Sequence, residues 1–511
     1  MIPRLTAILP ICLALAGPAK AALELVSELR LPKGAGEILT LDPAGGNVFG
    51  TDGAKGLVRI SLADPYNPKV EGTIDLRKIH PGGLSAVSSV AADPAGRGLV
   101  AAALIPKNPI CDRGLVVLID SRSGEVIHRM ESGWHPDCVS FSKDGRWLLV
   151  ANEGEFRKFQ PQTPGSLGVC DLSALKDLSG VGRLVLKDHP LGPREVVAGV
   201  RTPHESDPSR RHLDLEPEYV TSDGRHAYVS LQENNAIAVF DLRAGAWSRV
   251  IPLGSWPVRM DVSDRDGPWG RRAVNVTNLV EAMPMPDTIS VIEAGGRLLI
   301  ASANEGEGEE VARVKHLGTD GPALAPELRA ELKKQFGIDP QQDAALGRLQ
   351  VSKIDGLDAS GRISKLHAAG TRSFSLWDAA TGRRVYDSGS YFEDFAAGND
   401  PASFNTNGGK YSEWDRRSDN RGPETEAIAT ARVRGVPMVF VANERQNGLF
   451  AFNLSSPSKP SPVGYYNGRS GRHSAPECIL PVPAKATRLG RDLVITAWEG
   501  SSSITIHLVT P

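Results

Sequence analysis

Hydrophobic and polar residues alternate along most of the chain in short runs that are separated by turn residues. Residues 216–234, EPEYVTSDGRHAYVSLQEN, show the pattern well: an apolar run, an Asp-Gly turn and a second apolar run. A period of two, bounded by Gly, Asp and Pro, is typical of β-strands joined by tight turns. The sequence therefore predicts a β-hairpin in this stretch.

The same arrangement recurs through the chain. Residues 135–155, HPDCVSFSKDGRWLLVANEGE, repeat it closely, and looser copies begin at residues 34, 83, 285, 422 and 475. Most of these seven units continue into a third and a fourth run, such as NAIAVFDL at 235–242. Four antiparallel strands repeated seven times predict an all-β fold, a seven-bladed β-propeller in which each sheet packs on its neighbours.

The two ends of the chain are predicted to complete one blade. The last unit supplies three strands, at 477–483, 492–499 and 503–509, and the run ELVSELRLP at 24–32 belongs to no unit. We expect this N-terminal strand to pair with 503–509 and so to close the ring.

Two long segments do not follow the repeat. The first, at about 306–366, contains LAPELRAELKKQFG, which predicts a helix that starts near Pro326. The second, at about 389–422, is rich in Gly, Asn and aromatic residues, and we expect it to form an ordered cap. The sequence thus predicts a single propeller domain over residues 22–511 with two inserted loops, one of them partly helical.

The first 21 residues have the pattern of a secretory signal peptide. Arg4 precedes an apolar run, and Ala19-Lys20-Ala21 resembles a cleavage site. No later apolar run approaches the roughly 18 residues of a membrane span, and we expect no membrane anchor. We therefore expect a periplasmic or extracellular monomer. A formal charge of -2 argues against a nucleic-acid partner.

Acidic residues recur at two positions of the units, where the first strand begins and where the second ends. Because the two strands are antiparallel, both positions lie at the same end of the sheet. We expect a ring of carboxylates at the mouth of the central channel, made of Glu37, Asp52, Asp137, Glu153, Glu216, Glu218, Glu233, Asp287, Glu305, Glu424, Glu426, Glu444, Glu477 and Glu499.

Two interpretations of this ring remain open. The acids could accept backbone hydrogen bonds from the next blade as a repeated structural lock. Alternatively, some of them hold a hard cation, and calcium is the candidate cofactor because it prefers carboxylate and carbonyl oxygens. The arginines near enough in sequence to neutralise part of the ring are Arg194, Arg313, Arg372, Arg421 and Arg445. The candidate metal ligands are Asp137, Glu153, Glu216, Glu218, Glu233, Asp287, Glu305, Glu424, Glu444 and Glu477.

Other chemistry has little support in the sequence. It contains no GxSxG, HExxH or P-loop motif, so the usual hydrolase and nucleotide-binding classes lack their signatures. DVSDRDG at 261–267 has the spacing of part of a calcium loop without its distal acidic ligand, which predicts a polar loop. Cys111 follows the second strand of one unit and Cys138 enters the first strand of the next, and this placement predicts a disulfide between them.

The quoted repeats, together with SDRDG, FNTN, RSDNRGPETEAI and VANERQNGLFAFNL, resemble the choice-of-anchor I family over nearly the whole chain. That family includes proteins named after a mesenchyme-specific cell-surface glycoprotein, and some bacterial members are labelled alkaline phosphatase. The resemblance implies a secreted propeller. The fifth unit departs from the family pattern, because ANEGEGEEVARV stands where ANEGD-A-R-D-Y is expected.

Two functions follow from these observations. The first is a secreted binding or scaffold propeller that engages a protein, a glycan or a small molecule at an acidic, calcium-binding channel mouth. The alternative is a metal-dependent phosphoesterase of the alkaline phosphatase or phytase kind, in which the carboxylates hold a divalent ion that binds phosphate. The sequence leaves open whether the protein is an enzyme.

Overall fold

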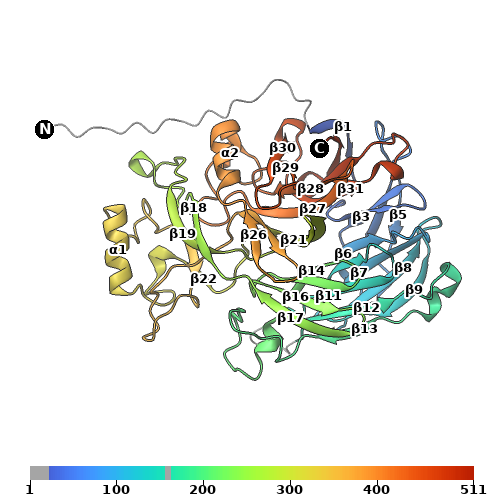
Figure 1. Ribbon diagram of the computed structural model, residues 1–511, viewed down its shortest axis with the longest axis horizontal. Coiled ribbons are helices and arrows are strands. Elements are labelled where there is room, and N and C mark those ends of the chain that lie inside the picture. Colours follow the sequence, from blue (N-terminus) through green and yellow to red (C-terminus); the bar gives the residue numbers. More distant parts are fainter. Residues whose placement is uncertain (1–21, 156–162) are drawn as a thin grey trace.

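The computed structural model describes residues 22–155 and 163–511, and the predicted signal peptide at 1–21 lies outside the described residues. Within them the chain forms seven four-stranded antiparallel sheets, one three-stranded sheet and one two-stranded sheet (Figure 1). The predicted all-β fold is confirmed. No helix of the described residues is long and apolar enough to cross a bilayer.

Six of the four-stranded sheets are each built mainly from one stretch of chain. The first three comprise β2 (Leu39–Asp42), β3 (Asn47–Asp52), β4 (Gly56–Ser61) and β5 (Lys69–Asp75); β6 (Leu84–Ala92), β7 (Leu99–Pro106), β8 (Leu115–Asp120) and β9 (Val126–Glu131); and β10 (Pro136–Phe141), β11 (Trp147–Asn152), β12 (Ser166–Asp171) and β13 (Lys187–Pro190). The next three comprise β14 (Pro217–Ser222), β15 (His226–Leu231), β16 (Ala236–Asp241) and β17 (Ala246–Pro252); β20 (Ile289–Ala294), β21 (Arg297–Asn304), β25 (Ser373–Asp378) and β26 (Arg384–Asp387); and β27 (Thr425–Val433), β28 (Val436–Asn443), β29 (Gly448–Asn453) and β30 (Ser461–Asn467).

The seventh four-stranded sheet joins the two ends of the described chain. It contains β31 (Pro476–Val482), β32 (Leu493–Trp498), β33 (Ser503–Val509) and β1 (Leu23–Arg30). β1 pairs antiparallel with β33, from Leu23 opposite Val509 to Arg30 opposite Ser503. The predicted pairing of the N-terminal strand with residues 503–509 is therefore present.

The hydrophobic core is divided into layers between neighbouring sheets. In β11, Leu148 and Val150 pack toward the preceding sheet, while Leu149 and Ala151 pack toward the following one. Alternate side chains of a strand point to opposite faces, so a strand buried on both faces is apolar throughout. Seven such clusters each join two neighbouring four-stranded sheets, and one of them joins the sheet of β2 to that of β31.

The first strands of the sheets lie next to one another. β2 lies beside β6, β6 beside β10, β10 beside β14, β14 beside β20, β20 beside β27, β27 beside β31 and β31 beside β2. The fourth strands are more exposed: β5 has no buried residue, and β9 has only Met130 buried. The first strands thus form the inner part of the assembly and the fourth strands its outer part.

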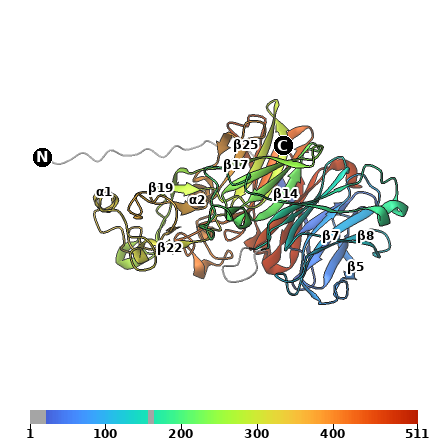
Figure 2. The same cartoon turned by 90° about the horizontal axis from the view of Figure 1, so that it is seen from below.

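The segment at about 306–366 contains the predicted helix, and a hairpin that the sequence pattern did not indicate packs with this segment. The predicted helix is α1 (Pro326–Phe336), which ends at Gly337 with φ of 73°. β18 (Trp256–Met260) pairs with β19 (Asn278–Met283), which also pairs with β24 (Ala368–Ala369). β22 (Val311–Arg313) pairs with β23 (Gln350–Ser352). These elements share one hydrophobic cluster, and Figures 1 and 2 show them on the side of the molecule away from β5, β7 and β8.

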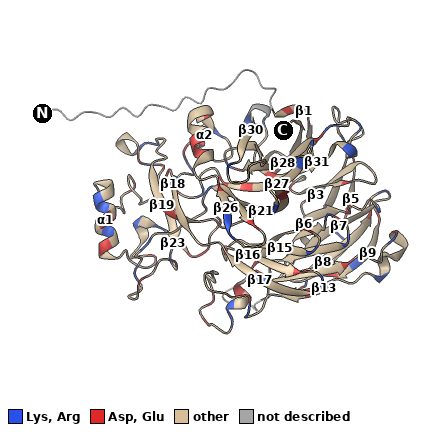
Figure 3. Ribbon diagram, in the orientation of Figure 1, with Lys and Arg blue, Asp and Glu red and all other residues tan. Residues whose placement is uncertain are grey.

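The second predicted insertion is an ordered cap, and it too is partly helical. α2 (Tyr391–Asn399) packs Phe392 into the cluster that contains Phe374, Phe450 and Phe452. Arg372, whose side chain is 1% exposed, pairs with Glu393 of this helix over 2.8 Å. Two of the aromatic residues that suggested order, Phe392 and Phe404, are fully buried and anchor this segment, whereas Tyr411 is exposed. By contrast, α1 buries no residue and carries charges of both signs along its surface (Figure 3).

The Cys111–Cys138 disulfide expected from the sequence is not formed in the structure, where both residues are free thiols. Cys111 lies on an exposed loop after β7, whereas Cys138 is 7% exposed and packs with Leu149 and Val229 between two sheets. Burial raises the pKa of the Cys138 thiol to about 12. Cys138 behaves as a small core residue.

Candidate functional site

Four of the predicted acids of the first strands occupy β-bulges. The pairing of β10 with β11 skips Asp137, that of β14 with β15 skips Glu218 and Tyr219, that of β27 with β28 skips Glu426, and that of β31 with β32 skips Glu477. A bulged residue leaves the ladder, and the bulge redirects its side chain. The repeated sequence pattern of an acid at the second position of the strand therefore encodes a bulge that presents a carboxylate.

Glu37 and Asp287 lie just before their strands. The N–H of Gly36 donates to the carbonyl of Thr51, whose own N–H donates to the carbonyl of Ile38, so Glu37 between them takes no part in this pairing. Asp287 donates its own N–H to the carbonyl of Ala303, whose N–H donates to the carbonyl of Thr288. In the sheet of β6 the skipped residues are Ser85 and Ser88. Six of the seven sheets thus carry an acid at or just before the start of the first strand, and we call these residues the inner carboxylates: Glu37, Asp137, Glu218, Asp287, Glu426 and Glu477.

The inner carboxylates lie close enough to influence one another's ionisation. Burial, followed by the charge of Glu499, raises the pKa of Glu37 to about 7. Burial, followed by the charge of Glu153, raises that of Asp137 to about 7. The pKa values of Glu218, Asp287, Glu426 and Glu477 are also raised well above their ordinary values, with burial as the largest cause and neighbouring acids next. Crowded like charges in a partly dehydrated space disfavour the ionised form.

Most acids of the second strands meet the inner carboxylates at the same end. Glu153 follows β11, Glu233 follows β15, Glu305 follows β21 and Glu444 follows β28. Burial and the nearby acids raise the pKa of Glu305 to about 7 and that of Glu444 to about 8. The predicted convergence of these residues is therefore present. Asp52 is engaged elsewhere, with its carboxylate 3.0 Å from Nζ of Lys55.

One half of this acidic end contains arginines. Arg421 contacts Glu305 and lies 3.0 Å from Glu424, which Arg417 and Arg445 also contact at 2.5 and 2.9 Å. Burial alone would raise the pKa of Glu424, but the three guanidinium groups together lower it. Arg421 and Arg445 were expected here from the sequence, whereas Arg417 was not. Two other arginines expected at the ring pair elsewhere, Arg313 with Asp419 and Arg372 with Glu393. Guanidinium groups already neutralise this half.

The other half is less well neutralised. Among the described residues, no lysine or arginine forms an ion pair with Asp137, Glu218 or Glu233. The Oε2 atoms of Glu218 and Glu233 are buried and accept no hydrogen bond from the described part of the chain. The whole of Glu233 is only 8% exposed. Burial, followed by the charges of Glu216 and Glu153, raises the pKa of Glu233 well above its ordinary value. Such groups are costly without a cationic partner.

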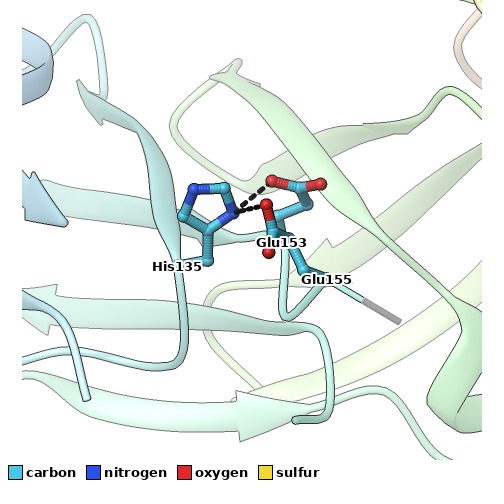
Figure 4. Close-up of side chains that lie close together, drawn as sticks. All are labelled: His135, Glu153 and Glu155. Carbon is cyan, nitrogen blue, oxygen red and sulfur yellow. Dashed lines mark ion pairs between the residues drawn. The ribbon is translucent and has the colours of Figure 1, made fainter. Parts of the chain in front are cut away.

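His135 lies at the edge of this second half. Its Nδ1 is 2.5 Å from Oε2 of Glu153 and 3.4 Å from Oε1 of Glu155 (Figure 4). Burial alone would lower the pKa of His135, but the hydrogen bond to Glu153 and the surrounding acids raise it to about 9. The ligand atoms of these three residues lie within 4.8 Å of one another, as do those of Glu305, Glu424 and Glu426. The latter set already has Arg421 among its carboxylates.

The sequence match that accompanies this geometry extends over most of the chain. Residues 37–457 match the model of the choice-of-anchor I domain. The chain belongs to the choice-of-anchor I family. The matched region contains five of the six inner carboxylates and ends before Glu477.

Two curated relatives of this choice-of-anchor I protein are similar to it in sequence over part of their length. Gigasin-3a of Magallana gigas is 37% identical over 124 residues, which are 23% of this chain and 42% of the relative. A mesenchyme-specific cell surface glycoprotein of Strongylocentrotus purpuratus is 29% identical over 289 residues, which are 49% of this chain and 36% of the relative. The matched regions thus span less than half of either relative.

Two solved structures resemble the choice-of-anchor I chain at 10% sequence identity. The match to Kuenenia stuttgartiensis hydrazine synthase has a TM-score of 0.46 and covers 94% of this chain and 96% of the synthase chain. The match to the β-propeller domain of Myceliophteria thermophila Cps50 (Swd1) has a TM-score of 0.48 and covers 96% of this chain and 100% of the domain.

The choice-of-anchor I domain also holds an acidic cluster that the sequence did not indicate. Residues 261–267 were expected to form a polar loop, but Asp261 is fully buried near Asp266 and near Asp415 of the second insertion. Burial, followed by the charge of Glu393, raises the pKa of Asp261 to about 8. Burial, followed by the charge of Asp261, raises that of Asp415 to about 9. Short-range spacing could not show that Asp415 meets this loop.

Proposed function

We propose that this choice-of-anchor I protein is a secreted seven-bladed β-propeller scaffold whose acidic end binds a divalent cation, with calcium as the first candidate. The bound cation and the surrounding oxygens would form the surface that engages a protein, a glycan or a small ligand. Propellers commonly bind partners at an end of the channel, where loops from several blades meet.

The seven-bladed ring is supported by the layered core. Each of the seven four-stranded sheets shares one hydrophobic cluster with the sheet before it and another with the sheet after it. β31 lies beside β2, and β1 completes the sheet of β31 to β33. An assembly of sheets in which every face is covered by a neighbour is what a closed propeller requires.

Cation binding is supported above all by the convergence of the six inner carboxylates. Within the described residues, no arginine or lysine forms an ion pair with Asp137 or Glu218, or with the nearby Glu233. A structural lock would use the carboxylate oxygens as acceptors for backbone N–H groups. The buried Oε2 atoms of Glu218 and Glu426 accept none from described residues. Carboxylate oxygens from several strands are the donors that calcium prefers.

The scaffold is better supported than the phosphoesterase. A phosphate bound beside the metal would need a cationic group that is free to contact it. Arg417, Arg421 and Arg445 are held by the carboxylates of Glu305, Glu424 and Glu444. Secretion remains part of the proposal and is supported by the family and by the signal pattern of the first 21 residues.

Calorimetric titration with calcium tests the proposal. Carboxyls with a pKa near 7 must lose protons when a metal binds, so the binding heat at pH 6.5 should depend on the ionisation enthalpy of the buffer. At pH 9, where Glu37 and Asp137 are already ionised, that dependence should be smaller. Absence of calcium binding by the wild-type protein would remove the proposal. Hydrolysis of p-nitrophenyl phosphate that requires calcium and disappears in Asp137→Asn would favour the phosphoesterase instead.

A further inference from the structure

His135, Glu153 and Glu155 are brought together by one antiparallel strand pair. His135 precedes β10, and Glu153 follows β11, which is antiparallel to β10. The N–H of Glu153 donates to the carbonyl of His135 over 2.9 Å, and the N–H of Gly154 donates to that of Trp134 over 3.1 Å. These bonds extend the ladder past the ends of the strands and fix the backbone on both sides of the three side chains.

The three side chains offer a nitrogen and two carboxylates to one small space (Figure 4). Nδ1 of His135 and one oxygen each of Glu153 and Glu155 lie within 4.8 Å of one another. Ligands on a single metal ion at about 2.0–2.2 Å from it are separated by distances of that order or less. Small side-chain rotations therefore suffice to direct all three atoms at one point.

A further acceptor interacts with Glu153. Glu233 is 8% exposed, and its Oε2 accepts no hydrogen bond from the described residues. The charge of Glu153 is among the causes that raise the pKa of Glu233. A buried carboxylate oxygen that lacks a donor and interacts with Glu153 is a second indication that a cation belongs at this end of the sheet.

We propose that His135, Glu153 and Glu155 bind a first-row transition metal or zinc, in a position distinct from the calcium held by the inner carboxylates. This inference rests on the proposed cation binding at the acidic end and adds the chemical class of a second ion. Calcium takes oxygen ligands, whereas imidazole nitrogen suits zinc, copper, iron and nickel. The histidine is therefore the residue that sets the preference for such a metal.

A simple ion pair is the competing explanation, in which protonated His135 neutralises Glu153 and no metal binds. The two explanations differ in what occupies Nδ1. A metal replaces the proton on Nδ1, and its affinity depends on the imidazole. An ion pair leaves the protein indifferent to zinc.

The test uses the full chain after removal of metals with a chelator. Zinc or cobalt(II) is titrated into the wild type, into His135→Asn and into the control His226→Asn, and the visible absorption of cobalt(II) reports its ligands. Asn tolerates the left-handed backbone of His135, whose φ is 48°. His226 also lies beside a carboxylate, that of Asp223, but at the other end of its sheet.

We expect the wild type and His226→Asn to bind zinc alike and His135→Asn to bind it at least about tenfold more weakly. Glu153→Gln should weaken zinc binding in the same way, which guards against a folding defect in one variant. The calcium response of His135→Asn should persist. Zinc affinity that is unchanged in both variants would overturn the inference. If calcium stabilises the wild type and zinc does not bind, this inference fails while the proposed function stands; if neither ion binds, both fail.

Discussion

Nη1 of Arg421 lies 3.0 Å from Oε1 of Glu424, and the same guanidinium contacts Glu305, which belongs to the neighbouring sheet. One arginine thus neutralises two carboxylates that would otherwise repel each other. This contact distinguishes the two halves of the acidic end, because the described residues place no such guanidinium on Asp137, Glu218 or Glu233.

Replacing Arg421 should therefore destabilise the fold. We expect Arg421→Gln to lower the free energy of unfolding by about 3 kcal/mol, since it leaves buried carboxylates without a counter-ion. Chemical denaturation in chelator measures the loss. Arg77→Gln is the control, because Arg77 pairs with Asp75 on the exposed surface and should change little. Equal stability of the wild type and Arg421→Gln would show that the arginine does not balance these acids.

The pH dependence of stability without metal should be unusual. The pKa values of Glu37, Asp137 and Glu305 are raised to about 7 and that of Glu444 to about 8. The folded state therefore keeps protons that the unfolded chain releases near pH 4 to 4.5, so stability falls as pH rises from there to about 8.

His135 changes stability in the same direction at higher pH, since its pKa is raised from 6.5 to about 9. Its contribution is complete below pH 6.5 and is lost as pH rises through about 9. Thermal melts in chelator between pH 5 and 9 test both statements. A melting temperature that climbs steadily over this interval would contradict them.

The N-terminal strand should be needed for stability. Deleting residues 22–31 removes the partner of β33 and the carboxylate of Glu28, which lies 2.8 Å from Nε2 of the buried His473. We expect a loss of several kcal/mol from lost burial and hydrogen bonds. Glu28→Ala, which removes only the contact with His473, should lose about 1 kcal/mol. A deletion variant with the same melting temperature as the wild type would refute the role of β1 in stability.

The cluster of Asp261, Asp266 and Asp415 should oppose folding at high pH. Because the pKa of Asp415 is raised to about 9, the wild type loses stability as pH rises from about 4 to about 9. Asp415→Asn cannot ionise, and Asn accepts the φ of 63° at this position. The amount by which its melting temperature exceeds that of the wild type should grow across that range in melts with chelator. A variant that is less stable than the wild type at pH 9 would show that the carboxylate is required there.

Much of this architecture could be predicted because short sequence patterns mark the ends of its strands and of one helix. Pro136-Asp137 and Pro217-Glu218 mark where first strands begin, and Asp-Gly turns mark where second strands follow. Antiparallel pairing then places the acids after both strands at one end. Pro326 and Gly337 similarly mark the two ends of α1.

The features that could not be predicted depend on contacts between distant segments. Nothing near Trp256 in the sequence indicates that β18 and β19 pack with residues 306–366 in one core. Spacing likewise cannot show that Arg417 reaches Glu424 or that Cys138 faces the core and away from Cys111. Tertiary packing determines these contacts, and its effect on structure can override the preference of the local sequence.

Calcium binding by the inner carboxylates is tested most directly by the melting temperature of the metal-free protein before and after addition of millimolar calcium, on the wild type and on Asp137→Asn/Glu218→Gln. A ligand that binds only the folded state stabilises it by about 2.7 kcal/mol at a hundredfold excess over its dissociation constant. The wild type should therefore melt at a clearly higher temperature with calcium, and the double variant should not respond. A wild-type melting temperature that is the same with chelator and with calcium would contradict cation binding and leave the carboxylates a structural role.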